Sequence, residues 1–135
     1  MNDHLYCTET AKSSAKFAHD FKDVVEKYGF IIGNEPAMDM AKTFSDHGGE
    51  VGPDFDLQMI QVCKPDKAAK SLSANPERSI LMPKFVMAFG KEGKTQIRFF
   101  YYNAETIAQM VNDEIFPESL AQTYKKMISM IDEAK

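Results

Sequence analysis

Two apolar segments separated by a short loop restrict the fold more than any other feature of the sequence. Residues 85–89 and 97–102 are rich in aromatic and β-branched side chains, and the loop at 90–93 begins and ends with glycine. Segments of this kind typically pair as the two strands of an antiparallel hairpin. The sequence therefore predicts a β-hairpin, with its turn at 90–93, in the C-terminal half of the chain.

The hairpin is expected to be apolar on both faces. Because side chains alternate along a strand, Phe99 lies on one face and Phe100 on the other. If helices cover only one face, a partner subunit or an apolar ligand must cover the second, since a soluble monomer rarely exposes many aromatic residues together. The alternative is that helices at 104–112 and 117–133 cover it. The residues expected to line the interface or ligand site are Phe85, Met87, Arg98, Phe99, Phe100, Tyr101 and Tyr102.

The rest of the chain predicts further strands and helices. Apolar residues from Phe17 to Tyr28 recur at helical spacing, with Ser13 and Ser14 as candidate N-caps and Gly29 at the end. More helices are predicted at 38–46, 65–74, 104–112 and 117–133, and more strands at 5–8, 30–32 and 57–63. This order predicts an α/β (α+β) sandwich, with a mixed sheet of about five strands that includes the antiparallel hairpin and with helices packed on the sheet.

Length and charge exclude several classes of protein. A chain of 135 residues predicts one domain over 1–135. Sixteen basic against 20 acidic residues give a net charge of -4, which argues against a nucleic-acid binder. No apolar run reaches the roughly 18 residues of a membrane-spanning helix. The first four residues hold no basic or apolar segment, so no export signal is expected; this favours the cytoplasm, or the periplasm if a signal has been removed.

Three short motifs together resemble one known family. They are Tyr28-Gly29-Phe30-Ile31-Ile32, Gln61-Val62-Cys63-Lys64-Pro65 and Leu81-Met82-Pro83. In order and spacing they are similar to the prokaryotic "domain of unknown function 302" family over residues 5–102, with 103–135 as a C-terminal helical extension. The resemblance implies a compact α/β sandwich that forms homodimers, and it implies no reaction. Members often carry a second cysteine where this chain has Lys84, so a paired-cysteine site with Cys63 cannot form.

Cys63 is the candidate reactive residue. It ends the predicted strand just before Pro65, where unpaired N–H groups at the start of a helix favour a thiolate, and Lys64 and Lys67 add positive charge. Such a thiol could act as nucleophile or carrier in sulfur or redox metabolism. The alternative is a buried, unreactive cysteine, because no histidine lies near it in sequence to act as a base. A disulfide between Cys63 and Cys7 also stays open.

His4 and Cys7 form the one candidate metal site in the sequence. Imidazole suits zinc, and soft sulfur ligands suit copper(I). The nine methionines are scattered rather than grouped, and most occupy apolar positions where methionine fills gaps in a core. Metal binding through His4 and Cys7 is therefore an alternative only, and no cofactor is identified.

The sequence favours a binding or assembly function over catalysis. It lacks the motifs of conventional hydrolases, kinases and dithiol redox enzymes, which argues against an enzyme without excluding one. The function expected is that of a small module, a homodimer that buries the aromatic face of its sheet or binds a small apolar ligand, with Arg98 or Tyr102 orienting that ligand. The alternatives are a thiol-dependent protein that uses Cys63 and a metal-binding protein that uses His4 and Cys7.

Overall fold

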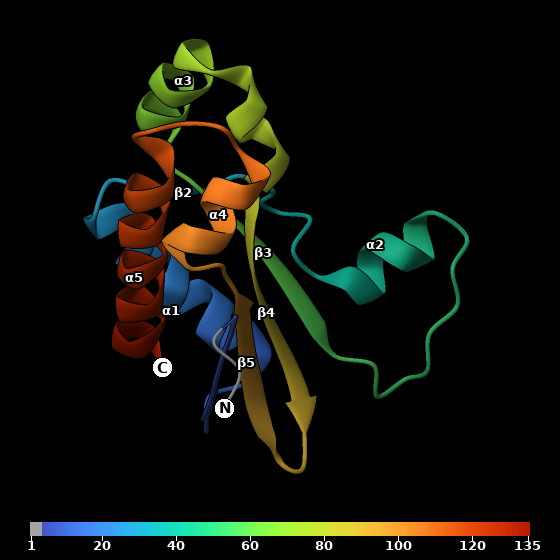
Figure 1. Ribbon diagram of the computed structural model, residues 1–135. Coiled ribbons are helices and arrows are strands. Elements are labelled where there is room, and N and C mark those ends of the chain that lie inside the picture. The colour runs from blue at the N-terminus through green and yellow to red at the C-terminus, as the bar shows by residue number, and fades with distance from the viewer. Residues whose placement is uncertain (1–3) are drawn as a thin grey trace.

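Five strands form one sheet in the spatial order β1-β5-β4-β3-β2 (Figure 1). They are β1 (Leu5–Thr10), β2 (Ile31–Ile32), β3 (Leu57–Cys63), β4 (Lys84–Lys91) and β5 (Lys94–Phe100). This computed structural model describes residues 4–135; residues 1–3, part of the segment that argues against an export signal, lie outside the described residues. The predicted α/β fold with about five strands is confirmed, and β4 and β5 form the predicted hairpin.

The relative direction of the paired strands differs from the one expected. The sequence predicts a mixed sheet, whereas every pairing between the strands in residues 4–135 is antiparallel. Helix α1 (Ser14–Lys27) carries the chain from β1 at one edge of the sheet to β2 at the opposite edge. These two strands run in the same direction, but three strands separate them. They therefore never pair, and β3, β4 and β5 fill the space between them, each antiparallel to its neighbours.

Local sequence determines several helix ends. The other helices are α2 (Met40–Asp46), α3 (Pro65–Ala74), α4 (Ala104–Met110) and α5 (Phe116–Ala134), with the 3₁₀ helix η1 (Pro76–Leu81) after α3. The Ser13 hydroxyl accepts a hydrogen bond from the Lys16 backbone N–H at 3.1 Å and caps α1. Gly29 follows α1 with a φ of 84°, a left-handed conformation that glycine adopts without strain. Within the part of the chain that the structure describes, no helix has the length and apolar character needed to span a membrane.

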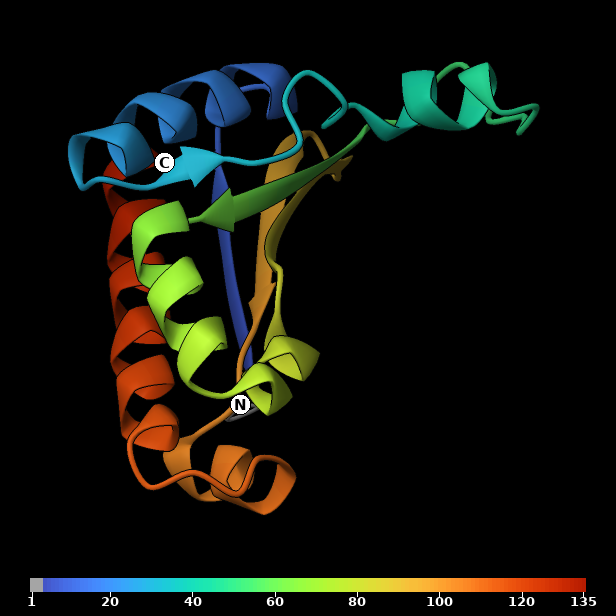
Figure 2. The same ribbon diagram turned by 90° about the horizontal axis from the view of Figure 1, so that it is seen from above.

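The core lies between the sheet and a single layer of helices. Helices α1, α3 and α5 lie on one side of the sheet, here called the inner face (Figure 2). Buried side chains of the central strands and the two longest helices meet there: Ile60, Val62, Val86, Ala88, Ile97, Phe99, Phe17, Phe21, Val25, Leu120, Met127 and Ile131. Each large apolar side chain buried in this way stabilises the fold by roughly 1.5–3 kcal/mol. This burial determines which face of every strand turns inward.

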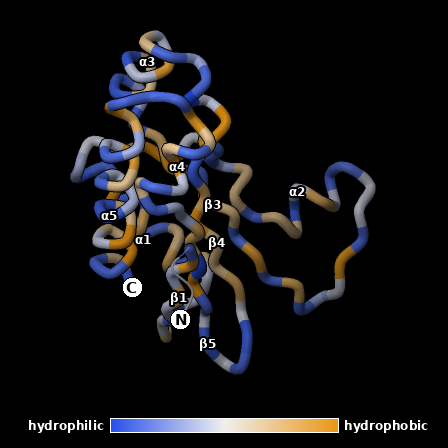
Figure 3. Tube along the Cα trace, in the orientation of Figure 1, coloured by the Kyte–Doolittle hydropathy of each residue, from blue (hydrophilic) through white to orange (hydrophobic). Residues whose placement is uncertain are grey.

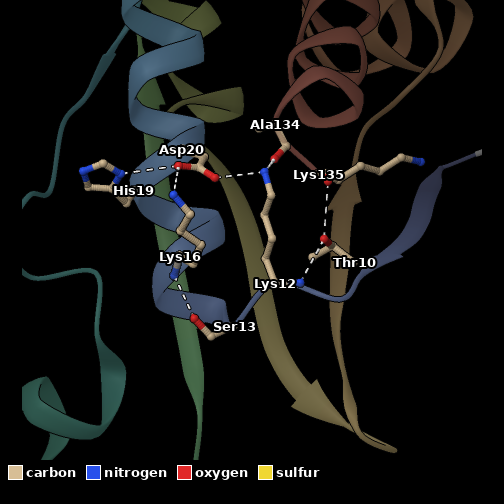
Figure 4. A network of polar contacts seen from close by, with 8 residues as sticks. All are labelled: Thr10, Lys12, Ser13, Lys16, His19, Asp20, Ala134 and Lys135. Carbon is tan, nitrogen blue, oxygen red and sulfur yellow. Dashed lines mark hydrogen bonds and ion pairs between the residues drawn. The ribbon is translucent and has the colours of Figure 1, made fainter.

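A network of polar contacts joins the C-terminal end of α5 to the start of α1 (Figure 4). The Lys12 ammonium donates to the Ala134 carbonyl oxygen at 2.6 Å and pairs with the Asp20 carboxylate at 2.9 Å. Asp20 also pairs with Lys16 one turn earlier on α1, at 3.0 Å. Segments from opposite ends of the sequence are thus held side by side, which keeps α5 on the inner face.

Residues 40–55, here called the arm, project away from the rest of the molecule (Figures 1 and 2). Residues 33–39, between β2 and the arm, still lie against β3, where the Asn34 side chain forms hydrogen bonds with the backbone of Met59 and Gln61. The arm carries α2 and extends away from the helical layer. No residue of α2 is buried. The rings of Phe44 and Phe55 lie 6.0 Å apart, yet these residues remain 39% and 37% exposed. Figure 3 shows apolar stretches along the arm as well as along the central strands.

Candidate functional site

The face of the sheet opposite the helices, here called the outer face, is largely apolar. Register and alternation assign to it Ile31, Leu57, Met59, Gln61, Cys63, Phe85, Met87, Phe89, Gln96, Arg98, Phe100, Leu5, Cys7 and Glu9. Phe100 is 50% exposed, Ile31 44% and Leu5 36%. Helices α1, α3 and α5 all lie on the inner face, so they leave the outer face without a helical layer (Figure 2).

The seven hairpin residues expected in one site divide between the two faces. Phe99 is 1% exposed on the inner face. The rings of Phe99 and Tyr101 both contact Tyr124 of α5, with centroids 5.8 and 6.0 Å apart. The outer face holds Phe85, Met87, Arg98 and Phe100. A site confined to one face therefore cannot contain all seven residues, because alternation places sequence neighbours on opposite faces. Helix α5, which the sequence suggests as a possible cover for the second face of the hairpin, lies on the inner face and not on the outer face.

Arg98 lies on the outer face in β5, the strand next to the edge strand β1. Its guanidinium group stacks over the Phe89 ring at 5.4 Å from the centroid and donates to the Gln96 side-chain oxygen at 3.2 Å. It also donates to the backbone carbonyl oxygens of Thr8 and Ile97, at 3.3 and 2.9 Å. Within residues 4–135 this guanidinium forms no ion pair with a carboxylate. The guanidinium does lie close enough to the Glu9 carboxylate to help lower the pKa of Glu9, after the larger effects of Lys94 and Gln96.

A cavity of about 140 Å³ opens at the end of the sheet where β4 begins. Its walls include Phe85, Phe100 and Tyr102, three of the residues that the sequence places in an apolar ligand site. Tyr124 closes it from the inner side, and burial, with a smaller contribution from Tyr102, raises the pKa of Tyr124 to about 12. The cavity is thus a largely apolar space whose wall also contains two phenol groups and Lys84.

The two cysteines are free and lie in different strands of the sheet. Cys63 is half-buried and pairs with Ile31 near one edge, whereas Cys7 is exposed and pairs with Arg98 from the other edge strand. Three strand spacings of roughly 4.8 Å, or about 14 Å in all, separate β3 from β1. A disulfide needs Cα atoms within about 7 Å, so the two thiols cannot bridge in this fold.

The structure does not bring His4 and Cys7 together. The His4 ring contacts the Tyr102 ring with centroids 5.4 Å apart, while Cys7 lies on the outer face opposite Arg98. Residues three positions apart along an extended chain point to opposite sides. Among the described residues, no group of three or more His, Cys, Asp or Glu side chains could hold a metal ion. Metal binding through this pair therefore has no supporting contact.

Sequence reasoning missed a lysine pocket on the inner face. Lys84 lies two positions before the buried Val86, so alternation turns its side chain inward, and this pattern was visible in the sequence. Burial lowers the pKa of the Lys84 ammonium, and the neighbouring charge of Lys67 lowers it further, while Cys63 acts in the opposite direction. Lys84, Lys67 and Lys64 line one pocket between the sheet, α3 and α5.

Comparison with known proteins agrees with this architecture. The family model described as "Domain of unknown function DUF302" matches residues 6–134, which include α4 and α5. The crystal structure of an uncharacterized conserved DUF302 protein from Bacillus stearothermophilus is similar in fold. Its TM-score is 0.79 at 16% sequence identity, and the match covers 99% of this chain and 100% of that chain. No curated protein matches the chain. The resemblance carried by three sequence motifs is therefore confirmed, and the chain belongs to the DUF302 family.

Proposed function

We propose that the protein is a homodimeric assembly module in which two copies cover each other's outer face. The observation that carries this proposal is the outer face itself, which presents apolar side chains from all five strands with no helical layer over them. Burial of apolar surface stabilises an association by roughly 25 cal/mol per Å² before the entropic cost of binding. Contiguous apolar patches on soluble proteins typically mark such contacts.

The arm supports a second copy as the occupant. It extends away from the helices and carries Phe44, Val51 and Phe55, which are 39%, 38% and 37% exposed. In a two-fold pair, the same surfaces of both subunits meet, so the arm of one copy can reach over the sheet of the other. Each copy would then supply both apolar surfaces, the outer face and the arm, and no different protein would be needed to cover them. Arg98, which has no ion pair to a carboxylate in residues 4–135, would be available to acceptors of the partner within the interface.

The oligomeric state tests this proposal directly. Size-exclusion chromatography with light scattering should give twice the chain mass of 15.3 kDa at high micromolar concentration. Phe100→Glu places a carboxylate on the outer face and should yield a monomer. Ile115→Glu is the matched control, because Ile115 is 72% exposed beside α5, and this variant should remain dimeric. A monomeric wild-type protein, or a dimer that survives F100E, would contradict the proposal.

A small apolar ligand is a second candidate, favoured by the cavity beside Phe85, Phe100 and Tyr102. Its volume of about 140 Å³ resembles that of apolar cavities of roughly 150 Å³ that bind one benzene molecule. Benzene should therefore shift the NMR signals of the Tyr102 ring in a saturable manner, and Phe85→Trp should fill the cavity and abolish the shift. Unchanged Tyr102 signals in saturated benzene would contradict this second function.

A further inference from the structure

Three lysines, Lys64, Lys67 and Lys84, line a single pocket on the inner face. The Lys84 ammonium contacts the Met82 sulfur at 3.4 Å, the Lys67 ammonium donates to the Thr123 hydroxyl at 2.9 Å, and the Lys64 ammonium lies 5.3 Å from the centre of the Phe30 ring. Within residues 4–135, none of the three forms an ion pair with a carboxylate. The three ammonium groups thus contact a thioether, a hydroxyl and an aromatic ring.

Gathering three ammonium groups in one pocket is electrostatically unfavourable. Like charges that lie close together repel one another, and the burial of Lys84 removes water that would otherwise stabilise its charge. The chain as a whole carries a net charge of -4, so the pocket is a local positive site on an acidic protein. A methionine at position 84 would fill the same space without this penalty. An anion bound among the three groups removes the repulsion, since it supplies the missing counter-charge.

The shape of the pocket restricts the anion to a small head group. Its volume is about 30 Å³, and its walls combine polar and apolar residues, Ser71, Ser119 and Thr123 with Phe30, Phe116 and Leu120. A larger groove of about 220 Å³ adjoins it and shares Phe30, Lys64, Lys67 and Thr123 with it. A ligand can therefore place a charged head in the pocket and a flat or aliphatic body in the groove, against Tyr28 and Phe30.

We propose that this pocket binds the carboxylate of a small organic acid. Lys64, Lys67 and Lys84 hold the carboxylate by charge-assisted hydrogen bonds, and Phe30 packs against the apolar body of the acid. Lys84 and Met82 also line the cavity beside Phe85, so the two cavities are neighbours at this end of β4. The pocket lies on the inner face, because Lys84 lies on the same side of β4 as the buried Val86. Ligand binding and dimerisation are therefore separate properties, and each can fail without the other.

Benzoate and benzyl alcohol are suitable probes, because they share a ring and differ in charge. Benzoate titrated into ¹⁵N-labelled protein should shift the backbone amide signals of α3 and of α5 near Thr123, with saturation. Benzyl alcohol should bind at least about tenfold more weakly, because it cannot make charge-assisted hydrogen bonds with the lysines. Equal shifts with the two probes, or benzoate shifts confined to the outer face, would overturn the proposal.

Variants of single lysines test whether benzoate binds in this pocket. Lys84→Met removes the ammonium without leaving a void and should fold at least as well as the wild type, while its benzoate affinity falls roughly tenfold or more. Lys67→Met, at an exposed position, should also weaken benzoate binding, and it replaces K84M in the test if K84M does not fold. Lys70→Met, an exposed lysine of α3 outside the pocket, should leave the affinity unchanged. Retained affinity in both K84M and K67M would show that the pocket is not a carboxylate site.

Discussion

Arg78 holds Asp113 by two parallel hydrogen bonds, from Nε to Oδ2 at 2.7 Å and from Nη2 to Oδ1 at 3.1 Å. The same carboxylate accepts the backbone N–H groups of Ile115 and Phe116, at 2.9 and 2.8 Å. The two charged side chains are only 12% and 7% exposed. One carboxylate thus joins η1 to the first turn of α5, and it caps a helix whose own N-cap residue, Ile115, has no capping side chain.

Replacing Asp113 by asparagine should lower the stability of the protein at neutral pH, because the charge that binds Arg78 is lost. Arg78, with smaller contributions from the Phe116 backbone N–H and Asn75, holds the pKa of Asp113 well below its usual range. A carboxyl group with a lowered folded-state pKa stabilises the fold above its unfolded-state pKa of 3.8, and this contribution is lost as the pH falls toward the folded-state pKa. Thermal unfolding of D113N should therefore show a large deficit at pH 7 and a smaller one at pH 3. The exposed-loop variant Asp54→Asn should show neither, and an equal deficit at both pH values would contradict this account.

The contact between Lys12 and Ala134 should control fraying at the end of α5. Lys12→Met removes a hydrogen bond to the last turn of α5 together with the ion pair to Asp20. Amide hydrogen exchange in that turn should accelerate roughly tenfold, in line with the loss of one charge-assisted hydrogen bond. Lys16→Met removes only a contact within α1 and should leave exchange in α5 unchanged. Equal acceleration in both variants would mean that Asp20, rather than the bond to Ala134, holds the helix end.

The sequence predicts well those features that depend on neighbouring residues. Ser13 and Gly29 mark the two ends of α1 because a cap and a left-handed turn act within a few positions. Alternation likewise separates Phe99 from Phe100, but it does not say which of the two faces the helices will cover. The antiparallel order of the sheet depends on where the crossover through α1 ends, about 20 residues after it begins. Lys84 illustrates the same limit, since its inward direction is visible in the pattern while its lack of a carboxylate depends on what α3 and α5 bring to it.

Phe99 and Phe100 should respond differently to the same truncation. Phe99→Ala empties a buried position on the inner face and should lower the free energy of unfolding by roughly 3–5 kcal/mol. Phe100 is 50% exposed on the outer face, so Phe100→Ala should lower the stability of the monomer by less than about 1 kcal/mol. Urea denaturation at low protein concentration, where dimers dissociate, measures both changes. At high concentration F100A should lose the additional stability that association gives the wild type. Similar losses in the two variants at low concentration would mean that the outer face is part of the monomer core.

Tyr124 should ionise last among the tyrosines as the pH rises. Burial, followed by the effect of Tyr102, raises its pKa from 10 to about 12. A raised folded-state pKa means that the native protein keeps a proton which the unfolded chain releases. The corresponding stability is therefore complete below pH 10 and declines as the pH rises toward 12. Ultraviolet titration of the five tyrosines should show a transition near pH 12 that disappears in Tyr124→Phe and persists in Tyr28→Phe.

Unfolding experiments should show that the stability of Y124F declines less steeply at alkaline pH than the stability of the wild type, because phenylalanine fills the same space and has no proton to lose. An unchanged alkaline decline would show that the Tyr124 hydroxyl is hydrated in solution, and the cavity beside Phe85 would then be open to water rather than apolar.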